Sequence, residues 1–160
     1  MQDVFVVLLL IIVANGAPIL VRFILGQHLS LPVDFHQRFF DGKRVFGNSK
    51  TWIGLISIPI LSVPAGWILG LTTEIGMLVG IGVVLGDLFS SFTKRRLGMK
   101  ESSMAIGLDQ IPESLFPFLL VNKVFSFALS EIAIGIVSFI ILELLVSRVL
   151  FWLHIRKQPY

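Results

Sequence analysis

The segment 75–92 reads IGMLVGIGVVLGDLFSSF, and Asp87 is the one charged residue in it. A helix of this length rises about 27 Å, close to the ~30 Å hydrocarbon core of a bilayer. The whole chain has the same character, because 55% of its 160 residues are apolar, 14% are charged and the mean hydropathy is +0.90. Soluble domains carry about 25% charged residues, so the sequence predicts an integral membrane protein.

Similar apolar runs lie on both sides of this segment and predict an all-α single membrane domain over residues 1–160. The five transmembrane helices are expected at about 4–25, 51–70, 75–92, 109–130 and 131–153. The fourth is the weakest, since its apolar run 111–121 covers only about half a bilayer. The absence of cysteine excludes disulfides, thiolate metal sites and a cysteine nucleophile.

Lysine and arginine are distributed unevenly along the chain. Of the 13, all except Lys123 fall in the predicted loops 26–50 and 93–108, at Arg22, or at the C-terminal end. With five spans these segments share one side, which the positive-inside rule makes cytoplasmic. The sequence therefore predicts a multi-pass protein of the cell membrane with an external N-terminus and a cytoplasmic C-terminus. A basic cluster beside a span is typical of topology or lipid contact, so no nucleic-acid partner is expected.

Glycines recur at i, i+4 spacing in the second and third spans. The pairs are Gly66 and Gly70, Gly76 and Gly80, and Gly82 and Gly86. Small residues at this spacing let helix backbones approach closely in lipid. The favoured interpretation is tight packing between these two spans, and a homodimer interface is the alternative.

Asp87 belongs to the most informative cluster of polar residues. Asp87, Ser90, Ser91 and Lys94 share one helical face, because their spacing is i, i+3, i+4 and i+7. A carboxylate recessed below hydroxyls and cations suits Mg²⁺ beneath bound phosphates. An ion pair of Asp87 with Lys94 or a nearby arginine is an equally weighted alternative.

Two further segments could contribute to such a site, which is expected to face the cytoplasm. Asp109 and Glu113 stand four residues apart at the start of the fourth span, where they would cap the helix or contribute to a two-metal site. The loop before the second span contains glycines, cations and hydroxyls in the runs 41–44 and 47–51. Such a loop can wrap phosphates through backbone amides, or it can touch anionic lipid.

These motifs, in this order, resemble those of the CDP-archaeol synthase family. The resemblance is carried by ANGAP at 14–18, DGKRVFGNSKT at 41–51, GDLFSSFTKRR at 86–96 and DQ at 109–110. The wider CDP-diacylglycerol synthases share the pattern Gly-Asp-x3-Ser-x2-Lys-Arg-x4-Lys-Asp. Its matches here are Gly86, Asp87, Ser91, Lys94, Arg95 and Lys100. Glu101 replaces the final aspartate, and of the family's Asp-Arg-x-Asp element only Asp109 matches, with Glu113 one place beyond the second acid.

The resemblance implies a membrane enzyme that transfers CMP from CTP to a lipid phosphate and needs Mg²⁺. The acceptor would be an archaeal-type ether glycerol phosphate or a phosphatidic-acid-like lipid, in phospholipid biosynthesis. The implied catalytic residues are Asp87, Asp109 and Lys94, with Mg²⁺ on the two aspartates and Glu113 left open as a third ligand. The implied binding residues are Asn15, Asp41, Lys43, Arg44, Gly47, Lys50, Thr51, Ser91, Arg95, Arg96, Lys100 and Gln110. A small membrane transporter and a structural membrane partner protein remain the alternatives.

Overall fold

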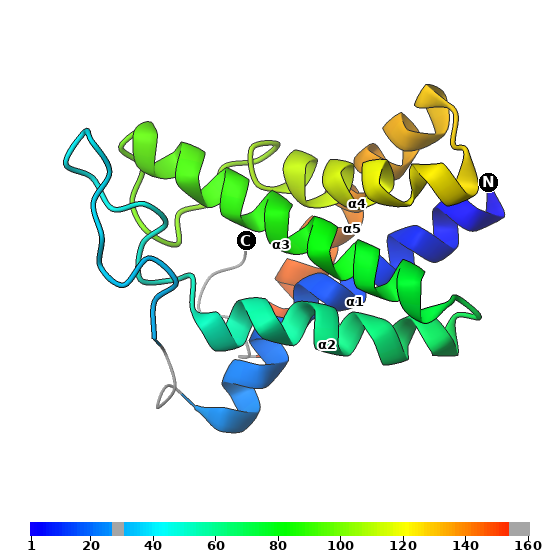
Figure 1. Cartoon of the computed structure of the whole chain (residues 1–160), viewed down its shortest axis with the longest axis horizontal. Coiled ribbons are helices and arrows are strands. Elements are labelled where there is room, and N and C mark those ends of the chain that lie inside the picture. The colour runs from blue at the N-terminus through cyan, green and yellow to red at the C-terminus, as the bar shows by residue number, and fades with distance from the viewer. Residues whose placement is uncertain (27–30, 154–160) are drawn as a thin grey trace.

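The computed structural model of the chain describes residues 1–26 and 31–153 (Figure 1). Within them the chain forms five helices, which are α1 (Gln2–Leu25), α2 (Trp52–Ile68), α3 (Thr73–Arg96), α4 (Gln110–Phe125) and α5 (Leu129–Trp152). The all-helical prediction is therefore confirmed. Residues 27–30 of the first loop and the tail from 154 onward, which the sequence places on the cytoplasmic side, lie outside the described residues.

Three of these helices, α1, α3 and α5, are long and apolar enough to cross a bilayer. Helix α2 is a shorter apolar helix of 17 residues. Helix α4 has 16 residues and ends at Phe125, although the sequence predicted a span that continues to about residue 130. It stops because Ser126 adopts the left-handed conformation (φ 53°, ψ 45°) and donates its amide to the Asn122 carbonyl at 2.8 Å.

Glycines of α3 bring it against α2. A Cβ atom on Gly76 would lie 2.9 Å from Cα of Val63, and one on Gly80 would lie 2.6 Å from Cα of Pro59. Real Cβ atoms do not approach backbone atoms this closely, so only glycine permits the spacing. The predicted close packing of the second and third spans is correct for these two residues.

The other glycine pair of α3 packs against α4 instead, which the sequence did not predict. A Cβ atom on Gly82 would lie 2.6 Å from Cα of Pro117, and one on Gly86 would lie 2.6 Å from Cα of Glu113. The two pairs are six residues apart, which is about 240° around a helix, so they face different neighbours. Both pairs are thus used within one chain.

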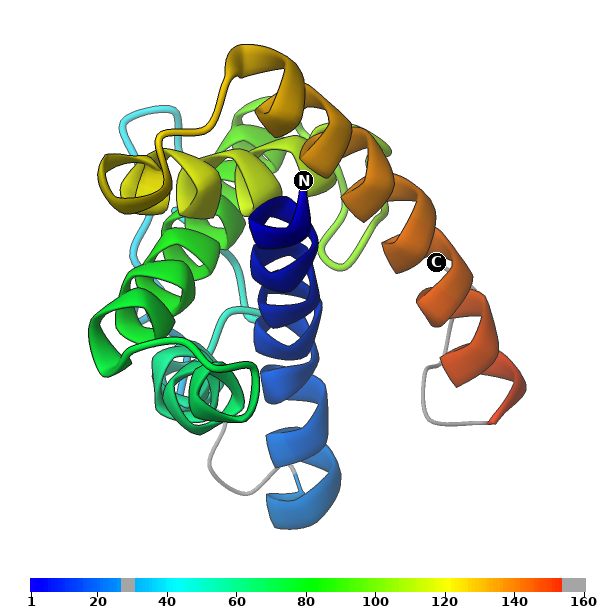
Figure 2. The ribbon, with the colours of Figure 1, turned by 90° about the vertical axis from the view of Figure 1, so that its right-hand side faces the viewer.

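Helix α1 runs through the middle of the bundle, and α5 lies to one side of it (Figure 2). The beginnings of α1 and α5 are joined by an ion pair of 3.1 Å between the Met1 ammonium and Glu131. The Phe118 ring of α4 fills the space beside Gly135 of α5. From there α5 leans away from α1, so the two helices diverge toward their C-terminal ends (Figure 2).

Candidate active site

A cavity of about 900 Å³ lies at the end of the bundle that carries the long loops. All five helices line it, together with parts of the loops 31–51 and 97–109. Ten of the residues singled out from the sequence line it: Asn15, Lys50, Thr51, Asp87, Ser91, Lys94, Arg95, Asp109, Gln110 and Glu113. Segments far apart in the chain therefore meet around one space.

Asp87 of α3 forms an ion pair with Lys50, which lies just before α2. The two side chains are 14% and 23% exposed, so the pair is largely shielded from solvent. Lys50 is held in place because its carbonyl accepts the Val33 amide at 2.9 Å. Thr51, the next residue, caps α2 by accepting the Gly54 amide at 3.3 Å. The expected partner of Asp87 on its own helix, Lys94, is engaged elsewhere.

Lys94 pairs with Asp109 at 2.7 Å and also donates to the Ser103 carbonyl at 3.1 Å. Asp109 precedes α4, but its side chain makes no cap hydrogen bond to that helix. It accepts the Ala105 amide at 3.0 Å instead, while Gln110 accepts the Gly107 amide at 2.8 Å. The capping interpretation is thus wrong for Asp109, because its carboxylate turns back toward the preceding loop and α3.

Glu113, one turn into α4, accepts a hydrogen bond of 2.9 Å from the Asn15 side chain of α1. Its backbone lies against Gly86, the residue before Asp87. Helix α5 contributes Glu143 to the same cavity. Carboxylates from three helices therefore face one space, and two of them, Asp87 and Asp109, are already paired with lysines.

Carboxylate oxygens are the donors that Mg²⁺ prefers in proteins. The aspartates of the two lysine pairs, Asp87 and Asp109, fit this requirement in donor type. In residues 1–26 and 31–153, however, no three acidic or histidine side chains converge closely enough to hold an ion as they stand. Mg²⁺ at these aspartates would therefore need the carboxylates to move closer together, or to share the ion with water and phosphate oxygens.

Asp34, which belongs to none of the motifs recognised in the sequence, organises the loop before α2. Its side chain is 1% exposed and accepts Arg44 at 2.5 and 3.2 Å and the amides of His36, Phe46 and Gly47 at 3.0–3.1 Å. Burial alone would raise the pKa of Asp34, but these five hydrogen bonds outweigh it and hold the pKa well below its usual range. The sequence offers only one hint of this role, which is an aspartate in a segment rich in turn residues. Residue spacing does not show which side chains or amides Asp34 would contact.

Arg96 fastens this loop to the end of α3. Its guanidinium lies over the rings of Phe39 and Phe92, with centroid distances of 4.9 and 4.8 Å, and pairs with Asp41 at 3.2 Å. Lys43 donates to the Arg96 carbonyl at 2.9 Å. Arg96, Asp41 and Lys43 were expected to bind substrate, but the structure does not bring them to the cavity wall.

Three other expected binding residues also lie off the cavity wall. Arg44 is engaged by Asp34, and Gly47 packs beside the Glu101 side chain. Lys100 is exposed, and its carbonyl accepts Arg95 at 2.9 Å. The wall does contain residues that were not expected, and these include Arg22, Asn48, Glu101, Ser102, Ser103 and Glu143. Two of these had a signal: Glu101 replaces an aspartate of the wider motif, and Glu143 is an acid in the middle of the fifth apolar run, where it needs a partner or a wet cavity.

Known proteins of one family resemble this chain over most of its length. A family model described as CarS-like, CDP-archaeol synthase, matches residues 1–160. The CDP-archaeol synthase of Pyrococcus abyssi is 34% identical over 151 residues, covering 88% of this chain and 82% of the relative. That of Pyrobaculum arsenaticum is 31% identical over 167 residues, covering 99% and 100%.

A solved intramembrane enzyme for archaeal membrane lipids biosynthesis has a similar fold, with a TM-score of 0.75. It is 23% identical, and the match covers 89% of this chain and 90% of that one. At this identity the likeness supports the fold, while the family match and the closer relatives establish the class of enzyme. The chain belongs to the CDP-archaeol synthase family of CTP-dependent nucleotidyltransferases.

Proposed function

We propose that this protein transfers CMP from CTP to the phosphate of an archaeal-type ether lipid, forming a CDP-lipid and pyrophosphate for phospholipid biosynthesis. The observation that carries the proposal is the pair of Lys–Asp contacts at one cavity wall. Lys50–Asp87 and Lys94–Asp109 bring four charged groups together from the loop before α2, from α3 and from the start of α4. A membrane transporter and a structural partner protein are not favoured, because the chain belongs to an enzyme family.

The proposed reaction needs charge stabilisation more than proton transfer. An oxygen of the lipid phosphate attacks the α-phosphorus of CTP, and the bond from that phosphorus to the pyrophosphate oxygen breaks. A phosphate monoester is largely ionised at neutral pH, since its second pKa is about 6, so the nucleophile needs no strong base. Lys50 and Lys94 would bind the phosphate oxygens on which negative charge accumulates.

The lysine pairs explain how the cavity can hold these groups without substrate. Lys50 and Lys94 each neutralise an aspartate in a space that is shielded from water. An isolated charge there would be costly, because burial penalises ions that lack a partner. When substrate enters, we propose that each lysine moves from its aspartate to a phosphate.

Mg²⁺ would be held by Asp87 and Asp109, with Glu113 as a third candidate, and would neutralise charge on the triphosphate. Asn15 then orients Glu113, through the hydrogen bond between their side chains. Ser91, Arg95, Gln110 and Thr51 complete the polar wall. The residues that line the cavity thus have, in this proposal, the same roles that the sequence led us to expect.

For the membrane arrangement we propose five spans in one domain, an external N-terminus, and a cytoplasmic C-terminus and cavity. Support comes from the position of the cations, because Lys50, Lys94, Arg95 and Arg96 gather at one end of the bundle. Lys123 lies at the far end of α4. Helices α2 and α4, with 17 and 16 residues, would span about 24–26 Å.

The test measures transfer of label from α-labelled CTP into lipid by the purified protein with Mg²⁺. Ether-lipid phosphate and phosphatidic acid are offered in parallel, and EDTA provides the metal-free arm. Asp87→Asn should abolish transfer, while Asp3→Asn, an exposed acid at the start of α1, should leave it unchanged. Circular dichroism and gel filtration of both variants check that they are folded.

Labelled lipid from the ether acceptor, lost with Asp87→Asn and with EDTA, would support the proposal. Near-normal transfer by folded Asp87→Asn would remove Asp87 from the metal site. Transfer to phosphatidic acid alone would correct the acceptor. No label with either lipid, in protein that also fails to bind CTP, would refute the proposed reaction.

A further inference from the structure

Arg22 is a cation on the cavity wall that the proposed chemistry does not use. It lies in the last turn of α1, seven residues after Asn15, so the two residues share one face of the helix. Their separation along the helix axis is about 10 Å. Asn15 is tied to the carboxylates of the cavity by its hydrogen bond to Glu113, and Arg22 lies about two turns further along the same face of α1.

Arg22 differs from the other cations of the cavity wall in its contacts within the chain. Lys50 and Lys94 are engaged by Asp87 and Asp109, and Arg95 donates to a carbonyl at 2.9 Å. No carboxylate of residues 1–26 and 31–153 lies within ion-pair distance of Arg22. Its guanidinium is thus a cation of the cavity wall that is available to an anion from outside the chain.

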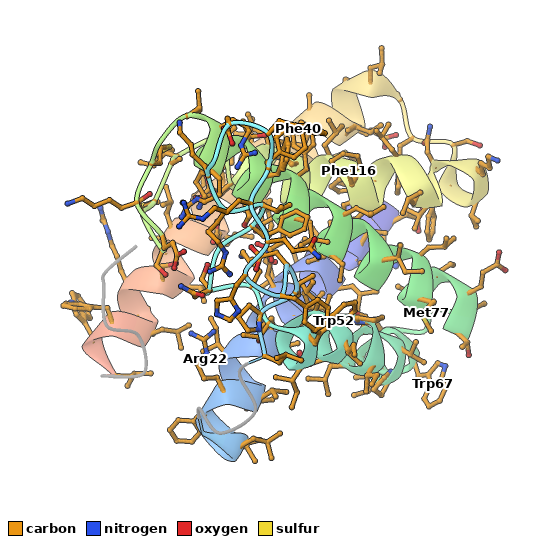
Figure 3. All side chains as sticks on the ribbon, turned by 60° about the vertical axis from the view of Figure 1, so that its left-hand side comes forward. Arg22, Phe40, Trp52, Trp67, Met77 and Phe116 are labelled. Atoms are coloured by element: carbon orange, nitrogen blue, oxygen red, sulfur yellow. The ribbon has the colours of Figure 1, made fainter. Side chains whose placement is uncertain are left out.

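The surroundings of Arg22 indicate what kind of anion it would receive. Ile19 and Phe23, which neighbour Arg22 on the last turns of α1, and Val146 and Leu150 near the end of α5 also line the cavity. Helices α1 and α5 diverge in this region (Figure 2), and the exposed side chain of Arg22 lines the cavity from α1 (Figure 3). A cation between apolar walls and a charged centre suits an amphiphile with an anionic head and hydrocarbon tails.

We infer that Arg22 binds the phosphate of the lipid acceptor and positions it for attack, an inference that rests on the proposed cytidylyl transfer. Side chains of a helix lean toward its N-terminus, so the guanidinium of Arg22 is directed back toward the level of Asn15. Arginine also suits this role chemically, because its planar fork can bind two phosphate oxygens at once. The lipid tails would lie along the apolar residues of α1 and α5.

The test compares Arg22→Gln and Arg22→Lys with the wild-type protein in neutral detergent micelles. Arg148→Gln is the matched control, since Arg148 is an exposed arginine near the end of α5 that does not line the cavity. The expected result for Arg22→Gln is a KM for lipid phosphate that rises about tenfold or more, because glutamine removes the charge of the fork and at least one charge-assisted hydrogen bond to the phosphate. The KM for CTP should stay unchanged, and lysine should restore part of the loss.

The other outcomes overturn the inference in distinguishable ways. An unchanged KM for lipid phosphate would exclude Arg22 from the acceptor site. A defect that appears only in vesicles rich in anionic bulk lipid would make Arg22 a contact to the bilayer surface. A raised KM for CTP would assign it to the nucleotide.

Direct binding separates this inference from the proposed reaction. Purified wild-type protein and Arg22→Gln are each loaded with labelled ether-lipid phosphate in micelles, without CTP, and the bound label is counted after gel filtration. About tenfold weaker retention by Arg22→Gln would support the inference even if no transfer were detected. Equal retention by both proteins would refute it even if transfer were observed.

Discussion

Replacing Asp34 with asparagine should loosen the loop that carries Lys50. In the native loop one oxygen of Asp34 accepts Arg44 and the His36 amide, and the other accepts Arg44 again and the amides of Phe46 and Gly47. Asparagine offers a single oxygen. In its best placement it keeps the second group of three and turns its NH₂ toward the other two donors.

The free energy by which Asp34→Asn destabilises the closed loop can be worked out from the two hydrogen bonds that are lost. A hydrogen bond to a charged group contributes about 1.5–3 kcal/mol. Because the Arg44 side chain is 18% exposed, water replaces part of the loss, and the lower end of the range applies, about 3 kcal/mol in total. That corresponds to about a hundredfold increase in the local opening equilibrium.

Hydrogen exchange of peptides covering 31–51, measured by mass spectrometry on the purified protein, reports this opening directly. Asp41→Asn is the control in the same loop, because the Asp41 side chain is 36% exposed and its pair with Arg96 is a surface pair. Such pairs contribute about 0–1 kcal/mol, so protection should fall by no more than about fivefold. If protection in Asp34→Asn fell no further than in this control, Asp34 would not organise the loop.

Two further predictions concern packing and pH. Gly86→Ala should lower Tm, because the new Cβ would collide with the backbone of α4 and overpacking costs about 1–3 kcal/mol; Gly16→Ala, where a Cβ meets no atom within 4 Å, should leave Tm unchanged or raise it. The protection of loop 31–51 should be constant above about pH 4, the ordinary pKa of an aspartate, and should decline progressively as pH falls below it. The reason is that the pKa of Asp34 is lowered in the folded loop, so below pH 4 the opened loop binds a proton more readily than the folded one. Exchange corrected for its intrinsic pH dependence tests this, and a decline of equal size in Asp34→Asn would contradict it.

The helices were predictable from the sequence because hydropathy and helix signals are local. The predicted ranges 4–25 and 131–153, for example, lie within two residues of α1 and α5 at each end. The end of α4 was missed because Ser126, a residue without a strong preference for the left-handed region, ends it. The helical face shared by Asp87 and Lys94 was also correct, but it did not reveal their partners.

Those partners come from other parts of the chain. Asp87 meets Lys50, which precedes it by 37 residues, and Lys94 meets Asp109 across the following loop. Spacing within a helix describes its faces, but it cannot say which loop will fold over them. For the same reason Arg96 looked like a ligand for phosphate, whereas the structure places it over two aromatic rings of its own chain.

The glycines of α3 also determine which parts of the protein can move. Two faces of this helix contact neighbouring backbones through glycines, one face against α2 and the other against α4. If the helix rotated by one residue, a side chain with a Cβ atom would replace a glycine and collide with one of these neighbours. The three helices therefore behave as one rigid block. Asp87 follows Gly86 directly, so the block itself sets the place of its carboxylate, and exchanging Lys50 for another partner requires no movement of the helix. The rest of the cavity wall comes from α1, α5 and the loops, so any movement that widens the cavity would involve those parts of the chain.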